Sequence, residues 1–428
     1  MRILWLKSDL LLPLDKGGRV RSWHLLRHLA ARHEVTYLSF VDPRQRDADI
    51  DGMREVARRV EVIPRSDPRK GSLRFYAGAA LHLLDPLPYA VGKYRSRAFS
   101  RRFSSILSEQ RFDLVVSDFL VPIVNLPNRL PCPAVLFTHN VEAEIWRRHA
   151  ETKPPGPVRA LYEIQARRMR RFEAEALGRF DGVLAVSDAD RATFSRLYPN
   201  AARKPVRVIR TGVDTKYFDA SAPMTTRSTE LVFTGSMDWL PNEDGMVFFC
   251  REILPAIRAR EPAVRLSIVG RSPTPRVRAL AGDAVRVTGG VEDVRPYMRE
   301  AAAYVVPLRV GGGTRLKIFE AMAMGKAVVS TSIGAEGLPI RDGEHAMIVD
   351  EPRAFADVVI RVMRDVPWRR QLERRARALV VERYDWSAVA GELEQALIEF
   401  AGVPSRLEPI PGRAERQTEL RLRNRAIS

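Results

Sequence analysis

This 428-residue sequence has very few cysteines and no long apolar segment. Its two cysteines, Cys132 and Cys250, provide neither a disulfide framework nor a zinc site and are compatible with a reducing cytoplasm. The longest charge-free apolar run, residues 75–84, is far shorter than the ~20 residues needed to span a bilayer. The N-terminal MRILWLKSDLLLP carries Lys7 and Asp9 within its apolar run, which makes it a poor signal peptide. We therefore expect a cytoplasmic protein, which could also lie peripherally on the inner face of the cytoplasmic membrane.

Acidic residues are too few to balance the basic ones. The sequence has 70 Lys+Arg against 52 Asp+Glu, a formal net charge of +18. Such an excess is compatible with nucleic acid, an anionic membrane surface or phosphorylated substrates. No helix-turn-helix, RNP or zinc-finger signature is present, so we expect no nucleic-acid partner. The charge is concentrated in residues 93–111 and 147–171 and in the tail from 406, and an arginine-rich composition bias would explain it equally well.

The length predicts two to three domains, and 45% hydrophobic residues indicate globular cores. The first half alternates short apolar runs with helical patterns, which is typical of a parallel α/β domain. Its expected strands are residues 3–6, 35–40, 60–63, 113–117, 134–138, 182–186 and 206–209. Its expected helices include residues 53–59, 159–175 and one that ends near residue 198 and is capped by Ser187 and Asp188. Gly17 and Gly18 open a further helix that ends near residue 33, at a strand's carboxyl end, where open α/β sheets bind ligands.

A polar segment, residues 219–229, then predicts an interdomain linker. The α/β pattern restarts after it, with a helix expected over residues 244–260. The expected strands of this half are residues 230–234, 265–269, 285–288, 304–308, 327–331 and 347–349. We therefore expect two α/β halves, each with glycine turns at strand ends.

Residues 303–331 carry the strongest functional signal. Gly311, Gly312 and Gly313 follow a predicted buried strand, so a ligand could approach their peptide groups closely. Thr314 can cap the next helix, which is expected to end near Met324. The N-terminus of a helix behind a glycine loop attracts anions. The motif therefore predicts a phosphate site, although three glycines also often form only a tight turn.

Charged residues in this helix support the phosphate prediction. Arg315 and Lys317 place two cations in the first turn, where a bare helix prefers acidic residues. Glu320, one turn further, could accept hydrogen bonds from two vicinal hydroxyls. Phosphates at the loop and a ribose at the second turn together indicate a nucleoside diphosphate. The alternative is that Lys317 and Glu320, three residues apart, form an ordinary surface pair.

His139 lies directly after the expected strand 134–138, a position where α/β sheets carry reactive groups. A lone histidine at such a position is nevertheless more often structural than catalytic. Residues 69–102 mix Phe and Tyr with Lys and Arg. This segment could lie on a membrane interface or form a core helix with a basic outer face, and the two interpretations have equal support.

Several motifs in this order resemble the GT-B glycosyltransferases of family 4, the retaining "group 1" enzymes. The resemblance extends from residue 1 to about residue 403. It rests on DKGGRVRSWHLLRHLAARHEVTYLSF, THNVE at 138–142, VSDADR at 186–191, VIRTGVDTKYF at 208–218, GSMDWLPNEDG at 235–245 and EAMAMGKAVVST at 320–331. The GSMDW and GGGTRLK variants resemble a branch associated with exopolysaccharide synthesis and PEP-CTERM/exosortase gene clusters.

The resemblance implies two Rossmann-like parallel-sheet domains that face each other across a cleft. The expected boundaries are an N-terminal acceptor domain 1–215, a linker 216–229, a donor domain 230–383, a C-terminal helix 384–403 that packs back on the first domain, and a basic, disordered tail 404–428. It also implies a nucleotide-sugar donor and a lipid-linked or saccharide acceptor, with an anionic membrane surface as a further partner.

The resemblance assigns roles to several residues. Glu320 would bond the ribose hydroxyls, Arg315 and Lys317 would meet the diphosphate, and His139 would contact the donor sugar. The donor-binding backbone would comprise Gly17, Gly18, Gly270, Arg271, Val291, Gly311, Gly312, Gly313 and Thr314. No metal or other cofactor is expected, because no Asp-x-Asp motif is placed to carry a metal; Asp188 and Asp190 read DAD but open a helix and are better explained as helix caps.

The chain departs from the family pattern at two places. Gly312 stands where a Glu is common, and the turn Gly235–Ser236–Met237–Asp238 lacks the Arg and Lys usual after the second domain's first strand. Arg315 and Lys317 could replace those cations. We expect a retaining, metal-independent glycosyltransferase; a GT-B nucleotide-sugar epimerase and a non-catalytic nucleotide-sugar binder are the alternatives.

Overall fold

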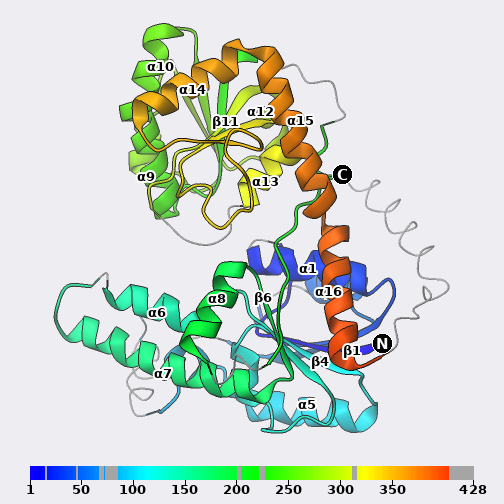
Figure 1. Cartoon of the computed structure of the whole chain (residues 1–428). Coiled ribbons are helices and arrows are strands. Elements are labelled where there is room, and N and C mark those ends of the chain that lie inside the picture. The colour runs from blue at the N-terminus through cyan, green and yellow to red at the C-terminus, as the bar shows by residue number, and fades with distance from the viewer. Residues whose placement is uncertain are drawn as a thin grey trace. The chain divides into compact units, whose positions relative to one another are not determined.

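The computed structural model describes residues 1–14, 17–44, 47–66, 72, 85–151, 153–199, 204–220, 227–310 and 316–403. These residues form two compact units (Figure 1). Unit 1 comprises Met1–Arg210 together with the described chain from Ala390 onward, and unit 2 comprises Thr211–Val389. Each unit has its own parallel sheet with helices packed against it, so the two α/β halves expected from the sequence are present.

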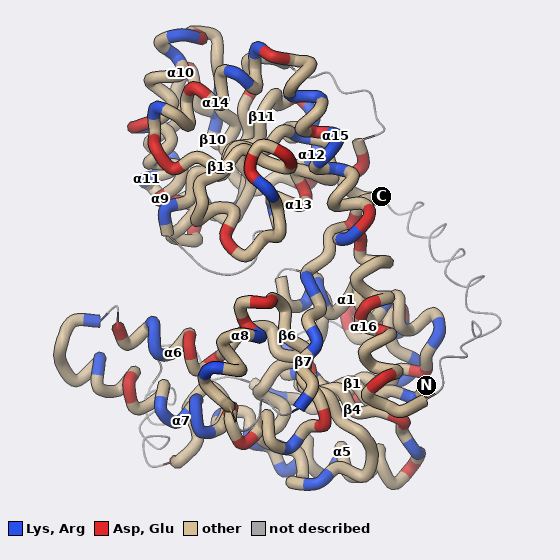
Figure 2. Tube along the Cα trace, viewed as in Figure 1, with Lys and Arg blue, Asp and Glu red and all other residues tan. Residues whose placement is uncertain are grey.

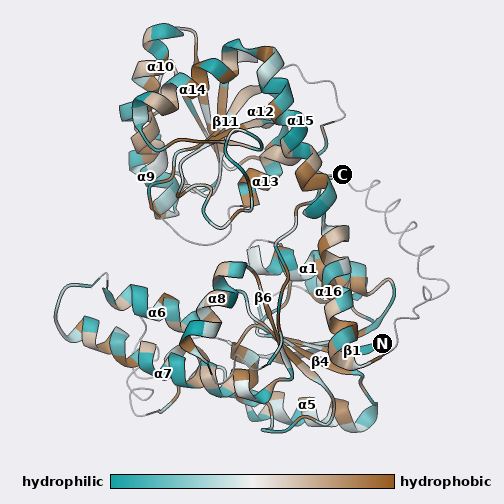
Figure 3. Ribbon diagram, in the orientation of Figure 1, coloured by the Kyte–Doolittle hydropathy of each residue, from teal (hydrophilic) through white to brown (hydrophobic). Residues whose placement is uncertain are grey.

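The described residues of unit 1 form a seven-stranded parallel sheet in the order β3-β2-β1-β4-β5-β6-β7. Its strands are β1 (Arg2–Lys7), β2 (Glu34–Val41), β3 (Arg59–Pro64), β4 (Leu114–Asp118), β5 (Ala134–Phe137), β6 (Gly182–Ala185) and β7 (Val206–Val208). β1 lies in the interior of the sheet, because Ile3 pairs with both Val35 and Leu114. The apolar runs of these strands lie inside the unit (Figure 3). All carboxyl ends of a parallel sheet lie at one edge, so the residues that follow β1, β4 and β5 are neighbours.

Helices and short helical turns surround this sheet. They are α1 (Gly17–Leu29), α2 (Asp47–Gly52), η1 (Met53–Glu55), α4 (Tyr89–Gly92), α5 (Arg97–Glu109), η2 (Val121–Asn125), α6 (Glu142–Glu151), α7 (Pro157–Arg179) and α8 (Asp188–Leu197). α1 buries Leu25, Leu26 and Leu29, as its pattern predicts. α6 packs along α7 (Figure 1).

The helix predicted over residues 53–59 is wrong. Only the single 3-10 turn η1 forms there, and β3 already begins at Arg59. The misleading signal came from Met53, Val56 and Ala57, which are fully buried and have helical spacing. They reach the core from a turn and an irregular connection, because burial alone does not require a helix.

The segment 69–102 is described only in part, since residues 67–71 and 73–84 lie outside the described residues. From residue 97 onward the core-helix interpretation is correct. α5 is capped by Ser96, whose hydroxyl accepts from the Phe99 amide. Phe99 and Phe103 are both 0% exposed and face the core rather than a membrane.

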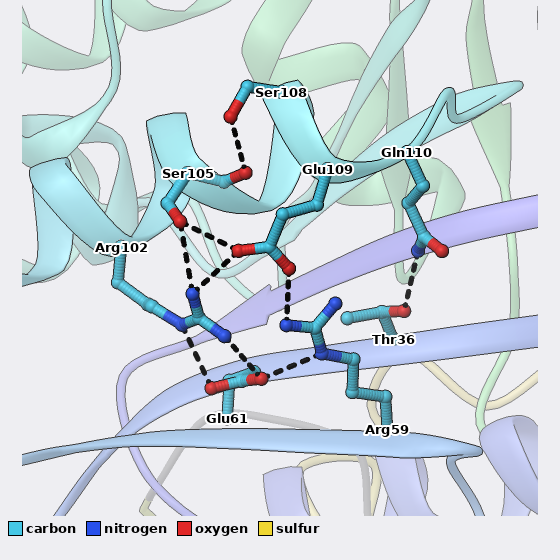
Figure 4. Close-up of polar contacts among 8 residues, drawn as sticks. All are labelled: Thr36, Arg59, Glu61, Arg102, Ser105, Ser108, Glu109 and Gln110. Carbon is cyan, nitrogen blue, oxygen red and sulfur yellow. Dashed lines mark hydrogen bonds and ion pairs between the residues drawn. The ribbon is translucent and has the colours of Figure 1, made fainter.

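The basic residues around α5 are also partly neutralised (Figure 4). Arg102 donates to Glu61 through Nε at 3.0 Å and to Glu109 at 2.8 Å, and Arg59 bonds the same two carboxylates. Hydrogen bonds from Ser105 and the two arginines lower the pKa of Glu109 to about 2. Arg102 therefore contributes little net positive charge to this face. Lys and Arg elsewhere lie on helices of both units rather than in one tract (Figure 2).

Unit 2 has a six-stranded parallel sheet in the order β10-β9-β8-β11-β12-β13 over its described residues. The strands are β8 (Arg227–Thr234), β9 (Arg265–Val269), β10 (Val285–Gly289), β11 (Ala301–Val306), β12 (Ala327–Ser330) and β13 (Met347–Ile348). The helices are α9 (Leu240–Phe248), η4 (Phe249–Ile253), α10 (Leu254–Arg260), α11 (Pro275–Arg278), α12 (Arg295–Glu300), α13 (Leu316–Ala323), α14 (Pro352–Arg364) and α15 (Val366–Arg383). The helix predicted over 244–260 begins earlier, at Leu240, and contains the π-helical turn η4 directly before Leu254 and Pro255. Pro255 has no amide hydrogen, which explains the irregular turn.

The last described helix, α16 (Trp386–Ala401), carries the chain from unit 2 back to unit 1. Glu394 on this helix accepts from Arg32 at 2.7 Å and lies 2.9 Å from Nε2 of the fully buried His33. A Cβ on Gly182 would lie 1.9 Å from the Phe400 ring, so β6 needs glycine beneath this helix. Residues 221–226 of the expected linker and the tail 404–428 lie outside the described residues. No described helix is both long and apolar enough to cross a membrane, and Cys132 and Cys250 are free.

Candidate functional site

Two groups of polar residues lie at the carboxyl ends of the two sheets, one in each unit. In unit 2 the glycine loop predicted to bind phosphate, with Gly311, Gly312, Gly313, Thr314 and Arg315, lies outside the described residues. The strand before it and the helix after it, β11 and α13, are described. α13 carries Lys317 and Glu320, which are both half-buried.

Lys317 reaches from α13 to the turn that follows β8. Its Nζ donates to Oδ1 of Asn242 at 2.8 Å and lies 4.1 Å from the centroid of the Phe233 ring. A Cβ on Gly235 would be only 2.8 Å from this Nζ. The ammonium therefore occupies the turn at residues 235–238, where the sequence itself supplies no cation. Interpreting Lys317 only as half of a surface pair is wrong, because this contact lies inside the unit.

A second cation reaches the same turn. Nε of Arg271, directly after β9, donates to Oγ of Ser236 at 3.1 Å, and that hydroxyl donates to Asp238 at 2.5 Å. The two turns are in close contact: Gly270 has φ +155°, and a Cβ there would lie 1.7 Å from the carbonyl oxygen of Gly235. Only glycine fits such an approach. Arg271 and Lys317 thus converge on one turn.

Glu320 lies one helical turn beyond Lys317. Burial raises its pKa from 4.5 to about 7, and the charge of Lys317 opposes that rise. Its charge in turn contributes to raising the pKa values of the Tyr304 and Tyr217 hydroxyls, for which burial is the main cause. A carboxylate in this position can accept hydrogen bonds from ligand hydroxyls once it is ionised. Val291, after β10, is half-buried and packs against the core of unit 2.

In unit 1, the structure brings His139 and Gly18 together. His139 follows β5, has a side chain that is 6% exposed, and stacks on Phe119 with centroids 4.0 Å apart. A Cβ on Gly18, in the first turn of α1, would lie 3.7 Å from Nδ1 of His139 and 3.1 Å from the Phe119 ring. Gly17 faces open space.

The sequence did not reveal the main partner of His139. Nε2 of His139 lies 2.8 Å from Oδ1 of Asp118, the last residue of β4, which is 0% exposed. Nζ of Lys7, the last residue of β1, lies 2.8 Å from Oδ2 of the same carboxylate. Ser22 and Trp5 also donate to Oδ2, at 2.6 and 3.0 Å. A usable signal was present, since Lys7 and Asp118 are opposite charges at the ends of two buried strands.

The electrostatics of this group favour an ionised aspartate and a neutral histidine. Burial opposes ionisation of Asp118, but Lys7 and His139 outweigh it and hold the pKa of the carboxyl well below its usual range. Burial lowers the pKa of His139 to about 4, with Lys7 and Arg21 adding to the effect and Asp118 opposing it. The pair therefore consists of a carboxylate and an uncharged imidazole at neutral pH.

The remaining site predictions concern metal ligands and the helix-cap roles of Ser187 and Asp188. In the described ranges, no three His, Cys, Asp or Glu side chains come together as metal ligands would. Ser187 caps α8, as predicted, by accepting from the Asp190 amide at 3.0 Å. Asp188 is not a cap, because its carboxylate pairs with Arg191 and Arg210.

Comparisons with known proteins match both units. Residues 16–217 match the profile "Glycosyltransferase Family 4", and residues 228–365 match "Glycosyl transferases group 1". A phosphatidyl-myo-inositol mannosyltransferase of Mycobacterium tuberculosis is 31% identical over 241 residues, which cover 53% of this chain and 62% of that relative. The chain thus matches less than two thirds of that relative's length.

Solved structures show the same fold. The sucrose-phosphate synthase of Thermosynechococcus elongatus is similar with a TM-score of 0.64 at 17% identity, over 94% of this chain and 99% of that one. The Anabaena protein Alr3699/HepE, solved in complex with UDP-glucose, is similar with a TM-score of 0.61 at 14% identity, over 93% of this chain and 100% of that one. These likenesses establish the two-domain GT-B architecture of the chain.

Proposed function

Because the chain belongs to family 4 of the GT-B glycosyltransferases, we propose that it moves a sugar from a nucleotide-sugar donor to a lipid-linked or saccharide acceptor. The context we propose is exopolysaccharide or cell-envelope glycan synthesis. The observation that carries the proposal is the pair of Lys317 and Glu320 on α13, a cation and an acid at the carboxyl edge of the unit 2 sheet. In that position they can meet a diphosphate and a ribose.

The comparisons support the chemical classes of donor and acceptor. The Anabaena structure contains UDP-glucose, which is a nucleotide sugar. The mycobacterial relatives are named for phosphatidyl-myo-inositol, a lipid acceptor, and for mannose transfer. The finer placement in the PEP-CTERM-associated exopolysaccharide branch rests on the GSMDW and GGGTRLK variants alone.

The mechanism follows from where charge develops. Breaking the bond between sugar and phosphate leaves negative charge on the departing diphosphate. Fixed cations stabilise that charge more in the transition state than in the ground state. Lys317 supplies such a cation, Arg271 lies at the same turn, and we assign Arg315 and the amides behind the glycine loop the same role. Glu320 holds the ribose, and His139 contacts the donor sugar.

We further propose that the enzyme retains anomeric configuration and needs no metal, as the family resemblance implies. The configuration of the product, measured by NMR, tests retention. Full activity in EDTA tests metal independence; activity that is restored only by a divalent cation would contradict it.

A panel of labelled sugar nucleotides, incubated with and without lipid extract, tests the main proposal. We expect label to move into an acceptor fraction in an acceptor-dependent manner. An altered sugar nucleotide without acceptor would indicate the epimerase alternative, and binding without turnover would indicate a non-catalytic binder. Lys317→Met should abolish most of the transfer. The matched variant Arg258→Met, which removes an exposed cation on α10 of the same unit, should not.

A further inference from the structure

Asp118 receives its hydrogen bonds unequally on its two oxygens. Oδ2 accepts from Trp5, Lys7 and Ser22, whereas Oδ1 lies against Nε2 of His139 at 2.8 Å. The indole N–H of Trp5 and the ammonium of Lys7 can only donate. The carboxylate therefore cannot rotate to exchange its oxygens without breaking these bonds.

This arrangement determines where His139 carries its proton. Asp118 is ionised and can only accept, so Nε2 of His139 must donate. The imidazole is neutral at pH 7 and has a single proton, so Nδ1 keeps its lone pair. Among the residues that the structure describes, none hydrogen bonds to Nδ1. Nδ1 is thus an acceptor without a described partner inside the protein.

The surroundings keep Nδ1 available to a ligand. A Cβ at position 18 would lie 3.7 Å from Nδ1 and 3.1 Å from Phe119, so glycine leaves space over the ring edge. The Phe119 ring contacts both the Lys7 ammonium, 4.3 Å from its centroid, and the His139 ring, which stacks on it. Phe119 has φ +80°, an unusual value for a phenylalanine, and its amide donates to the Phe137 carbonyl at 2.9 Å. Strain of this kind is concentrated at functional sites.

We propose that Asp118 is a positioning residue that holds the proton of His139 on Nε2 and so presents Nδ1 as a hydrogen-bond acceptor to a hydroxyl of the transferred sugar. This inference rests on the proposed function. A neutral acceptor bonds a hydroxyl but repels phosphate or carboxylate oxygens, so His139 would recognise the sugar and not the diphosphate. Lys7 balances the buried charge that the arrangement requires.

Asp118→Asn tests the proposal sharply. Trp5 and Lys7 can still only donate, so the substituted side chain must turn its amide oxygen toward them. Its NH₂ group then faces Nε2 of His139. His139 must then move its proton to Nδ1 and becomes a donor at the sugar. The matched control is Asp113→Asn, the same substitution at the exposed opposite end of β4, where the carboxylate accepts from the Arg2 amide.

Two readouts decide the result. The first is the tautomer of His139, measured by NMR of protein with ¹⁵N-labelled histidine. The second is a comparison, for each variant, of the change in turnover with the change in affinity for the bare nucleoside diphosphate. We expect a proton on Nε2 in the wild type and on Nδ1 in Asp118→Asn. Turnover should fall at least about tenfold, roughly the effect of one hydrogen bond, while diphosphate affinity stays within about twofold. Asp113→Asn should change neither readout.

The proposal is overturned by a wild-type proton on Nδ1, by a charged His139 at pH 7, or by a switched tautomer with full turnover. If Asp118→Asn does not fold, the wild-type tautomer still decides, together with His139→Asn and His139→Gln. Asn places an acceptor near the Nδ1 position and should retain more turnover than Gln; the opposite order would refute the proposal. The tautomer measurement does not depend on turnover, so it remains informative if the wild type transfers no sugar, which would refute the proposed function instead.

Discussion

Replacing Lys317 by Met should weaken nucleoside diphosphate binding by about 10- to 150-fold. A charge-assisted hydrogen bond to a phosphate contributes about 1.5–3 kcal/mol, and each 1.4 kcal/mol is tenfold in affinity. Methionine keeps most of the apolar stem of Lys317 and removes the ammonium, which lies over the Phe233 ring and donates to Asn242. The loss should therefore report the contact with phosphate rather than a change in packing.

The same substitution should also lower the stability of the free protein. Lys317 donates to Asn242, which is 2% exposed, so its removal leaves a buried acceptor without this bond. We expect a cost of about 1–3 kcal/mol. Relief of the repulsion between a cation and a helix N-terminus offsets about 0.3–1 kcal/mol of it. Sequence reasoning alone predicts no loss of stability here, because it does not show the bond to Asn242.

Calorimetry with UDP and GDP measures the affinity, and urea unfolding measures the stability. Arg258→Met is the control and should change neither quantity by much, since it lies exposed on α10. Unchanged diphosphate affinity combined with lower stability would refute the reasoning and make Lys317 purely structural. The double variant with Arg315 and Lys317 both replaced by Ala should bind still more weakly.

Four further predictions can be tested independently. His139→Ala should lower turnover far more than it lowers diphosphate affinity, and equal losses would indicate a structural role. Because burial raises the folded-state pKa of Glu320 to about 7, its contribution to the free energy of unfolding should be present below about pH 4.5 and lost as the pH rises through 7. Glu320→Gln should therefore flatten that pH dependence in urea titrations, and an unchanged slope would contradict this. Phe99→Ala should destabilise unit 1 by about 3–5 kcal/mol, whereas Arg101→Ala on the exposed face of α5 should stay within about 0.5 kcal/mol. Finally, we predict flotation with anionic vesicles through residues 69–111 that weakens at high salt, with about 1 kcal/mol for each basic residue near the surface other than the paired Arg102; no flotation at low salt would exclude the idea.

The sequence by itself predicted most of the fold. Strands such as β11 and β12 were found because a buried parallel strand is a short, nearly continuous apolar run. The glycine turns at positions 235 and 270 were visible too, and they lie where strands end. His139 was located by the same local rule, since it directly follows a predicted strand. These features depend on neighbouring residues, so a local pattern can report them.

Only the tertiary structure showed the partners on which the chemistry depends. Asp118 and His139 are 21 positions apart, Lys7 and Asp118 are 111 apart, and Lys317 and Asn242 are 75 apart. Parallel strands bring such residues to one edge of a sheet, and the strand order, which the tertiary structure sets, decides which of these side chains meet. Protonation depends on the same assembly, because desolvation and fixed neighbouring charges exist only once the chain has folded. The sequence alone therefore located His139 and Lys317, whereas burial and long-range contacts decided what each of them can bind.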